Sequence, residues 1–113
     1  MIKLEEILKY ITSDLKLSVS EQIEFESQFM QLFVYNLLLD IPDQYKNGIE
    51  KITGESELKD QALLAEEITN LGISKEDANN FLNNSIKKSI SEVIGKYDDV
   101  LSSETKEKLQ NYI

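Results

Sequence analysis

Apolar residues recur at helical spacing along nearly the whole chain, and β-type alternation is never sustained. In the first segment, for example, Leu4, Ile7 and Ile11 follow the i, i+3, i+7 spacing that gives a helix one apolar face. The same period predicts helices over residues 4–11, 19–40, 42–53, 57–71, 74–97 and from 103 onward. The connections are short, which favours antiparallel packing of neighbours. We therefore predict an all-α fold with a single domain over residues 1–113, a compact bundle of five to six helices.

Local signals mark where these helices begin and end. Ser18 and Glu21 have the spacing of a capping box, in which each residue satisfies the backbone amide of the other. Pro42 ends the second helix, because proline lacks an amide and disfavours α geometry at the residue before it. Two glycines and two serines are the other predicted stops and caps: Gly54, Gly72, Ser56 and Ser74. The predicted inner stripe of segment 57–71 is Leu58, Ala62, Ala65 and Ile68.

The helix around which the bundle is centred, residues 19–41, is apolar over most of its circumference. A helix that is apolar nearly all round is usually central to its fold. A small bundle of short helices is poorly able to cover so wide an apolar surface, however, and uncovered patches mark interfaces. Both interpretations remain open from the sequence. The candidate interface residues are Phe29, Met30, Phe33, Val34, Leu37 and Leu38.

Four residue types are absent from the chain: histidine, cysteine, tryptophan and arginine. Histidine is the usual proton shuttle near neutral pH, and histidine and cysteine are the usual ligands of zinc and other transition metals. The four glycines are too widely spaced for a phosphate-binding loop, and no serine lies in a nucleophile elbow. We therefore expect a non-enzymatic protein without a metal or cofactor. The absence of cysteine fits a reducing cytosol, so we expect a cytoplasmic protein.

The net charge of −9 is distributed unevenly along the chain. Residues 1–77 hold sixteen acidic residues and seven lysines, whereas residues 78–113 hold five of each. Such a surface repels the phosphates of nucleic acid and of anionic lipid, because phosphate binding needs clustered cations. The longest nearly apolar run, residues 29–41, is also shorter than the roughly 20 residues that a membrane-spanning helix needs. We therefore expect no nucleic-acid partner and no membrane partner.

From residue 33 onward the segments follow one another in a recognisable order. An apolar helix runs into the sequence LLDIP at residues 38–42, and a short acidic helix and a helix pair patterned with leucine and isoleucine come next. This order resembles an uncharacterised all-helical bacterial domain of unknown function, and the resemblance covers residues 19–97. It implies an all-helical fold and a bacterial source. It implies no activity, cofactor or site residue.

These features favour a small acidic protein-interaction module that binds a protein partner or self-associates as a homodimer. The alternative is an acidic inhibitor or decoy of the phage or plasmid type, which mimics nucleic acid and binds a basic protein surface. The apolar surface of residues 19–41 motivates the first hypothesis, and the net charge of −9 motivates the second. A third class is a carrier of a small apolar ligand, whose cavity would lie among the Phe and Tyr side chains.

Overall fold

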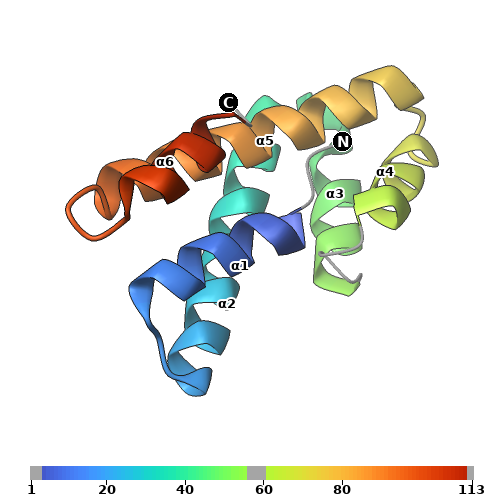
Figure 1. Ribbon diagram of the computed structural model, residues 1–113. Coiled ribbons are helices and arrows are strands. Elements are labelled where there is room, and N and C mark those ends of the chain that lie inside the picture. The colour runs from blue at the N-terminus through green and yellow to red at the C-terminus, as the bar shows by residue number, and fades with distance from the viewer. Residues whose placement is uncertain (1–3, 56–60, 112–113) are drawn as a thin grey trace.

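The computed structural model describes residues 4–55 and 61–111, and these residues form six α-helices and no β-strand (Figure 1). The helices are α1 (Leu4–Leu15), α2 (Val19–Asp40), α3 (Asp43–Glu55), α4 (Gln61–Thr69), α5 (Lys75–Lys96) and α6 (Ser103–Gln110). They pack around one hydrophobic core into a body of 41 × 28 × 21 Å. The predicted all-α, compact bundle of five to six helices is therefore confirmed.

The boundaries of α2 follow from the residues that flank it. The Ser18 hydroxyl accepts a hydrogen bond from the Glu21 amide at 3.3 Å, and the Ser18 amide donates to the Glu21 carboxylate at 3.1 Å. This pair is the predicted capping box, which satisfies amides that the first helical turn leaves without partners. Pro42 follows the helix, and Ile41 before it is already extended, as the proline ring requires.

Two glycines behave differently at the ends of α3 and α4. Gly72 follows α4 with a φ of +102°, a conformation that glycine adopts without steric cost, so the predicted stop is confirmed. The stop predicted at Gly54 is wrong, because this residue remains helical and α3 continues to Glu55. The cap predicted at Ser56 and the inner residue predicted at Leu58 lie outside the described residues.

The buried side of α4 also differs from its prediction at one position. The helix turns Leu64, Ala65 and Ile68 toward the core and leaves Ala62 exposed. The inner position predicted at Ala62 is therefore wrong. Burying the leucine removes more apolar area from water than burying the alanine, so the leucine decides how α4 is oriented.

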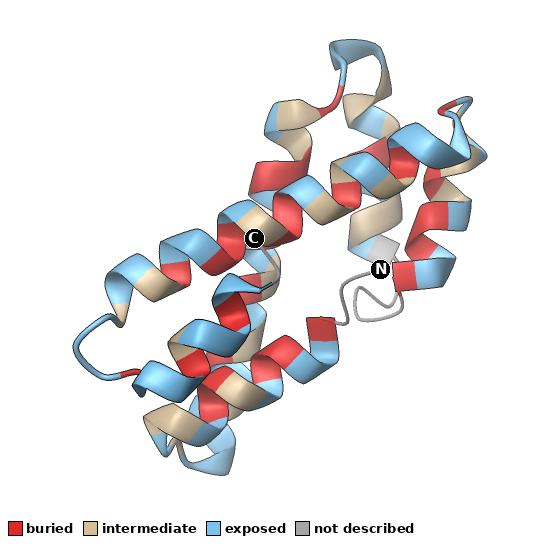
Figure 2. Ribbon diagram, turned by 45° about the horizontal axis from the view of Figure 1, so that its top comes forward, coloured by how far each residue is buried: buried red, intermediate tan, exposed pale blue. Residues whose placement is uncertain are grey.

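The centre of the bundle is the pair formed by α2 and α5, which make its most extensive helix–helix contact. Phe25 lies edge-on to Tyr97 with ring centroids 5.9 Å apart, and Asp40 pairs with Lys88 at 2.8 Å. The residue numbers of the contacting side chains therefore rise along α2 while they fall along α5. The two helices run in opposite directions. Figure 2 shows that buried residues follow one side of α5 and that exposed residues follow the other.

A short chain of hydrogen-bonded polar groups lies in the middle of the contact between α2 and α5. Asn36 is buried, and its Nδ2 donates to the Ser89 hydroxyl at 3.0 Å. Ser89 donates in turn to the Ser85 carbonyl at 2.8 Å, so these buried groups find hydrogen-bond partners. Both serines are fully buried, and their small side chains let α2 approach α5 closely.

The bundle is closed by a contact between α1 and α6. The Ser102 amide donates to the Asp14 carboxylate at 2.8 Å, and the Lys108 amine lies 4.9 Å from the centroid of the Tyr10 ring. Asp14 and Ser102 are 88 residues apart in the sequence. The first and the sixth helix are therefore held together, with α1 lying across α2 and α6 beside α5 (Figure 1).

Candidate functional site

Three of the six predicted interface residues lie in the hydrophobic core. Phe29, Phe33 and Leu37 are almost completely buried, because α2 turns this side toward its neighbouring helices. Phe33 and Leu37 have no exposed area and Phe29 is only 2% exposed, so none of them offers a surface to a protein partner, and their prediction as interface residues is corrected. Their apolar character serves the interior of the bundle.

The other three predicted interface residues are half-buried, and two of them line an open groove between α2 and α3. Met30 and Val34 belong to this groove, whereas Leu38 packs against the core and does not line it. The groove has a volume of about 420 Å³. We call it the α2–α3 groove, and its lining residues are Ser27, Met30, Gln31, Val34, Glu50, Thr53 and Gly54.

The apolar side of this groove continues beyond it along α2. Val19 and Ile23 are 74% and 64% exposed, although both are large apolar residues. At 100° per residue, these two and the groove residues Met30 and Val34 fall within about 60° of the helix circumference. The four residues therefore form one apolar stripe, which we call the α2 stripe. The prediction from sequence missed Val19 and Ile23, although their spacing from Met30 and Val34 places all four residues on one side of the helix.

The charge around the groove is negative. Among the described residues that line it, Glu50 is acidic and none is basic. Residues 19–54 hold six acidic residues and two lysines. Two of these acids are paired, Asp43 with Lys46 and Asp40 with Lys88, each at 2.8 Å, so the remaining acids are four glutamates. The hydrogen bond from Lys46 and its charge lower the pKa of Asp43, so this carboxylate stays ionised well below neutral pH. The site thus combines an apolar stripe with a negative surround.

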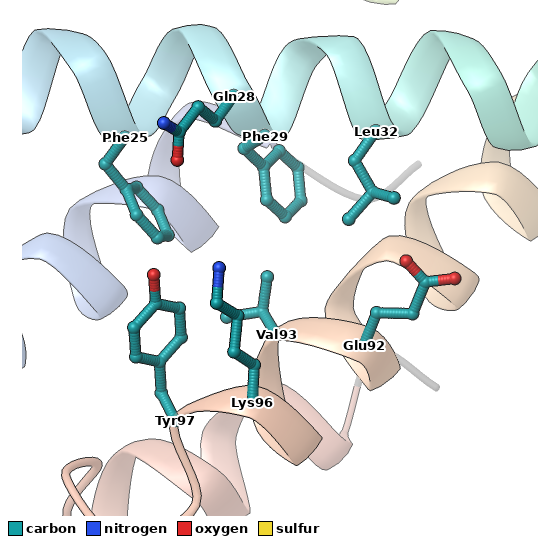
Figure 3. A pocket seen from close by; sticks show the side chains of 8 residues that line it. All are labelled: Phe25, Gln28, Phe29, Leu32, Glu92, Val93, Lys96 and Tyr97. Carbon is teal, nitrogen blue, oxygen red and sulfur yellow. The ribbon is translucent and has the colours of Figure 1, made fainter.

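A second hollow lies on the opposite side of α2, against the C-terminal end of α5 (Figure 3). Its volume is about 260 Å³, and its walls are mostly aromatic and aliphatic. We call it the α2–α5 pocket, and its lining residues are Phe25, Gln28, Phe29, Leu32, Glu92, Val93, Lys96 and Tyr97. No residue lines both this pocket and the α2–α3 groove, so the two sites are separate.

Two further carboxylates with a lowered pKa lie at helix ends, away from both hollows. Hydrogen bonds from the Ser18 amide and hydroxyl lower the pKa of Glu21 in the capping box of α2. For Asp14, desolvation raises the pKa, but hydrogen bonds from Ser102 and Thr105 and the charge of Lys108 together outweigh it and lower the value. These ionised groups stabilise helix ends.

Within residues 4–55 and 61–111, no group of three or more carboxylates is placed to hold a metal ion. No helix in the same ranges has the length and apolar character needed to cross a membrane. Comparison of the chain with protein families, curated proteins and solved structures found no match. The geometry of the groove and the pocket therefore carries the functional argument.

Proposed function

We propose that this protein is an interaction module that binds a basic amphipathic helix of a partner protein along the α2–α3 groove. One observation carries the proposal: an exposed apolar stripe on α2 runs into an open groove whose only charged lining residue among those described is Glu50. Helix-in-groove recognition uses this combination, since an apolar face enters the groove and the flanking charges set orientation and specificity.

The length of the α2 stripe defines the partner segment. Val19 and Val34 are fifteen positions apart, which corresponds to about 22 Å along a helix. A partner helix of about four turns, with apolar residues at i, i+4, i+7 and i+11, would cover this length. Lysine or arginine on its flanks would lie near Glu50 and the other acidic residues of α2 and α3.

Charge favours a basic partner over a second copy of this chain. Each copy carries a net charge of −9, and residues 19–54, which include the groove, hold six acidic residues against two lysines. Joining two such surfaces brings like charges together, whereas a basic helix neutralises them. Light scattering after gel filtration, over a hundredfold range of concentration, separates the two cases, because a stable dimer would show that the stripe is covered by self-association.

The direct test uses a synthetic helical peptide of about 17 residues with leucines on one face and lysines on the flanks. A matched peptide carries glutamate in place of lysine. We expect the lysine peptide to bind at least about tenfold more tightly, and its affinity to fall with added salt as the charges are screened. Fluorescence anisotropy with labelled peptides measures both. Equal binding of the two peptides would overturn the proposal.

The matched protein variants are Ile23→Lys on the stripe and Val100→Lys away from it. The two side chains are 64% and 59% exposed, so both changes add one positive charge at an accessible apolar position without disturbing the core. We expect Ile23→Lys to weaken binding of the lysine peptide at least about tenfold, because it places a cation on the docking surface. Val100→Lys should leave binding within about twofold.

A second candidate function, an acidic inhibitor or decoy of a basic protein surface, is favoured by the net charge of −9. It makes a different prediction for the same peptides and variants. Binding of the lysine peptide would then depend steeply on salt but would be equally strong for Ile23→Lys and Val100→Lys. The pair of variants therefore separates apolar docking from attraction by charge alone.

A further inference from the structure

The α2–α5 pocket has a pre-formed apolar interior. Phe29 and Val93 are buried and form its base, and Phe25 is fixed by its edge-on contact with Tyr97 at an angle of 61° between the rings. Leu32 closes the far end (Figure 3). Walls whose side chains already make contacts in the core need little rearrangement when a ligand enters, and this lowers the entropic cost of binding.

One cation lies at the mouth of this apolar interior. Figure 3 shows the Lys96 amine between the two helices, on the same side as the Tyr97 hydroxyl and the Gln28 amide. The amine lies 5.4 Å from the centroid of the Tyr97 ring, and it makes no ion pair with any carboxylate of the described residues. The mouth of the pocket thus carries one positive charge and two neutral polar groups, and its interior is lined by aromatic side chains.

We propose that the α2–α5 pocket binds a small aromatic carboxylate. Its ring would lie between Phe25, Phe29 and Val93, and its carboxylate would accept hydrogen bonds from the Lys96 amine and the Tyr97 hydroxyl. A hydrogen bond between ionised groups is about twice as strong as one between neutral groups, so the carboxylate gains most from this arrangement. This inference is independent of the proposed function, because the pocket and the groove share no lining residue.

The size and the remaining charge of the pocket narrow the ligand further. Its volume of about 260 Å³ is below the range of about 300–1,000 Å³ typical of drug-sized ligands, so one ring with a short side chain fits it. Glu92 also lines the pocket, and its carboxylate lies beside Leu32, away from the Tyr97 hydroxyl (Figure 3). A second carboxylate on the ligand would approach Glu92 and be repelled.

The probe for the test is 3-phenylpropionate, titrated into ¹⁵N-labelled protein and followed by two-dimensional NMR. We expect saturable shifts at the backbone amides of residues 25–32 and 92–97. Two analogues of the same length, 3-phenylpropanamide and 3-phenylpropylamine, replace the carboxylate by a neutral amide and by an ammonium group. Equal or tighter binding of either analogue, or shifts that map elsewhere on the protein, would overturn the inference.

Two variants test the assignment of the cation. Lys96 and Glu92 are both exposed, so Lys96→Gln and Glu92→Gln preserve the fold while removing charges of opposite sign. We expect Lys96→Gln to weaken binding of 3-phenylpropionate about tenfold or more, and Glu92→Gln to leave it unchanged or tighter. Unchanged binding in Lys96→Gln would refute the role of the amine.

A cross-check keeps this test distinct from that of the α2–α3 groove. Ile23→Lys should leave binding of 3-phenylpropionate unchanged, and Lys96→Gln should leave binding of the lysine peptide within about twofold. If the peptide binds and the carboxylate does not, only the pocket inference fails. If the carboxylate binds and the peptide does not, only the proposed function fails.

Discussion

At the scale of single residues, Asp14 connects α1 to the start of α6 through a 2.8 Å hydrogen bond from the Ser102 amide. Its pKa is lowered from the usual 3.8 in the folded protein, since hydrogen bonds and the charge of Lys108 outweigh the desolvation that raises it. A carboxylate whose pKa is lower in the folded state stabilises the fold above the unfolded pKa. That contribution is lost as the pH falls through the folded value.

The corresponding prediction concerns Asp14→Asn. We expect the free energy of unfolding to fall by about 0.5–1.5 kcal/mol at pH 7, because the ionised acceptor is removed. The difference from the wild type should disappear in strong acid, below the lowered folded-state pKa of Asp14, where its carboxyl is protonated and neutral like the asparagine side chain. Urea unfolding at both pH values measures this, with the exposed Asp99→Asn as the control. An equal loss at both pH values would show that Asp14 acts by packing rather than by charge.

Asn36 offers a second prediction at this scale. Ser89→Ala removes the acceptor of the buried Asn36 amide and leaves that donor without its partner, so we expect a loss of about 1–3 kcal/mol in the free energy of unfolding. Adding Asn36→Leu removes the unpaired donor and should restore part of the loss. Urea unfolding of the two single variants and the double variant forms a double-mutant cycle. Strictly additive effects would mean that the hydrogen bond contributes nothing.

At the scale of the helices, the sequence predicts the limits of α2 but not the side that it buries. The capping box of Ser18 and Glu21 and the stop at Pro42 are local signals, so they need no knowledge of the rest of the fold. Apolar residues cover most of the helix, so no side stands out as the one that faces the core. The buried side is set by the neighbouring helices, above all by α5, with which α2 makes its most extensive contact.

The residues of the candidate site also divide into those that the sequence predicts and those that it does not. Met30 and Val34 are predicted as candidate interface residues because they are apolar residues of α2, and the structure places both in the lining of the α2–α3 groove. The participation of Glu50 could not be predicted, since the groove exists only where α2 and α3 lie beside each other. The place of Lys96 beside the pocket could not be predicted either, because no local sequence signal distinguishes a lysine beside a pocket from one in solvent. Features formed by a single helix are visible in the sequence, and features formed between helices are not.

Two glycines give a prediction at the scale of the helix. Gly95 lies in the last turn of α5, and a Cβ there would meet no atom within 4 Å, whereas Gly72 has a φ of +102°. We expect Gly95→Ala to stabilise the protein by about 0.5–1 kcal/mol, because alanine has the higher helix propensity. Gly72→Ala should destabilise it by about 1 kcal/mol or more, because a Cβ is strained at that φ.

The same chemical change is thus expected to have opposite signs at the two sites, and urea unfolding followed by circular dichroism measures both. Stabilisation by Gly72→Ala would mean that the turn after α4 adopts another conformation in solution. A loss of stability in Gly95→Ala would mean that α5 ends before its last turn.

At the scale of the whole molecule, net charge is the property that the sequence predicts best. The chain has no histidine, so its charge of −9 stays nearly constant between about pH 6 and pH 8. Self-repulsion of this size opposes the compact state. The four described ion pairs (Lys46–Asp43, Lys88–Asp40, Lys106–Asp98 and Lys108–Glu104) are at least partly exposed, and such pairs contribute little.

We therefore expect the melting temperature to rise by about 2–5 °C when NaCl is increased from about 10 to 200 mM, because screening weakens the self-repulsion. The rise should be the same at pH 6 and pH 8. Differential scanning calorimetry measures it, and sucrose at the same osmolality provides a neutral control. A fall in the melting temperature would show that the ion pairs outweigh the repulsion.

The contact between α1 and α6 can form only late in the synthesis of the chain on the ribosome. At a synthesis rate of about 5–20 residues per second, the 88 residues from Asp14 to Ser102 take about 4–18 s to appear. During this time the apolar side of α1 lacks part of its final cover, although α2 has already been made. Completion of the bundle therefore waits for α6, and the apolar side of α1 stays partly uncovered for those seconds.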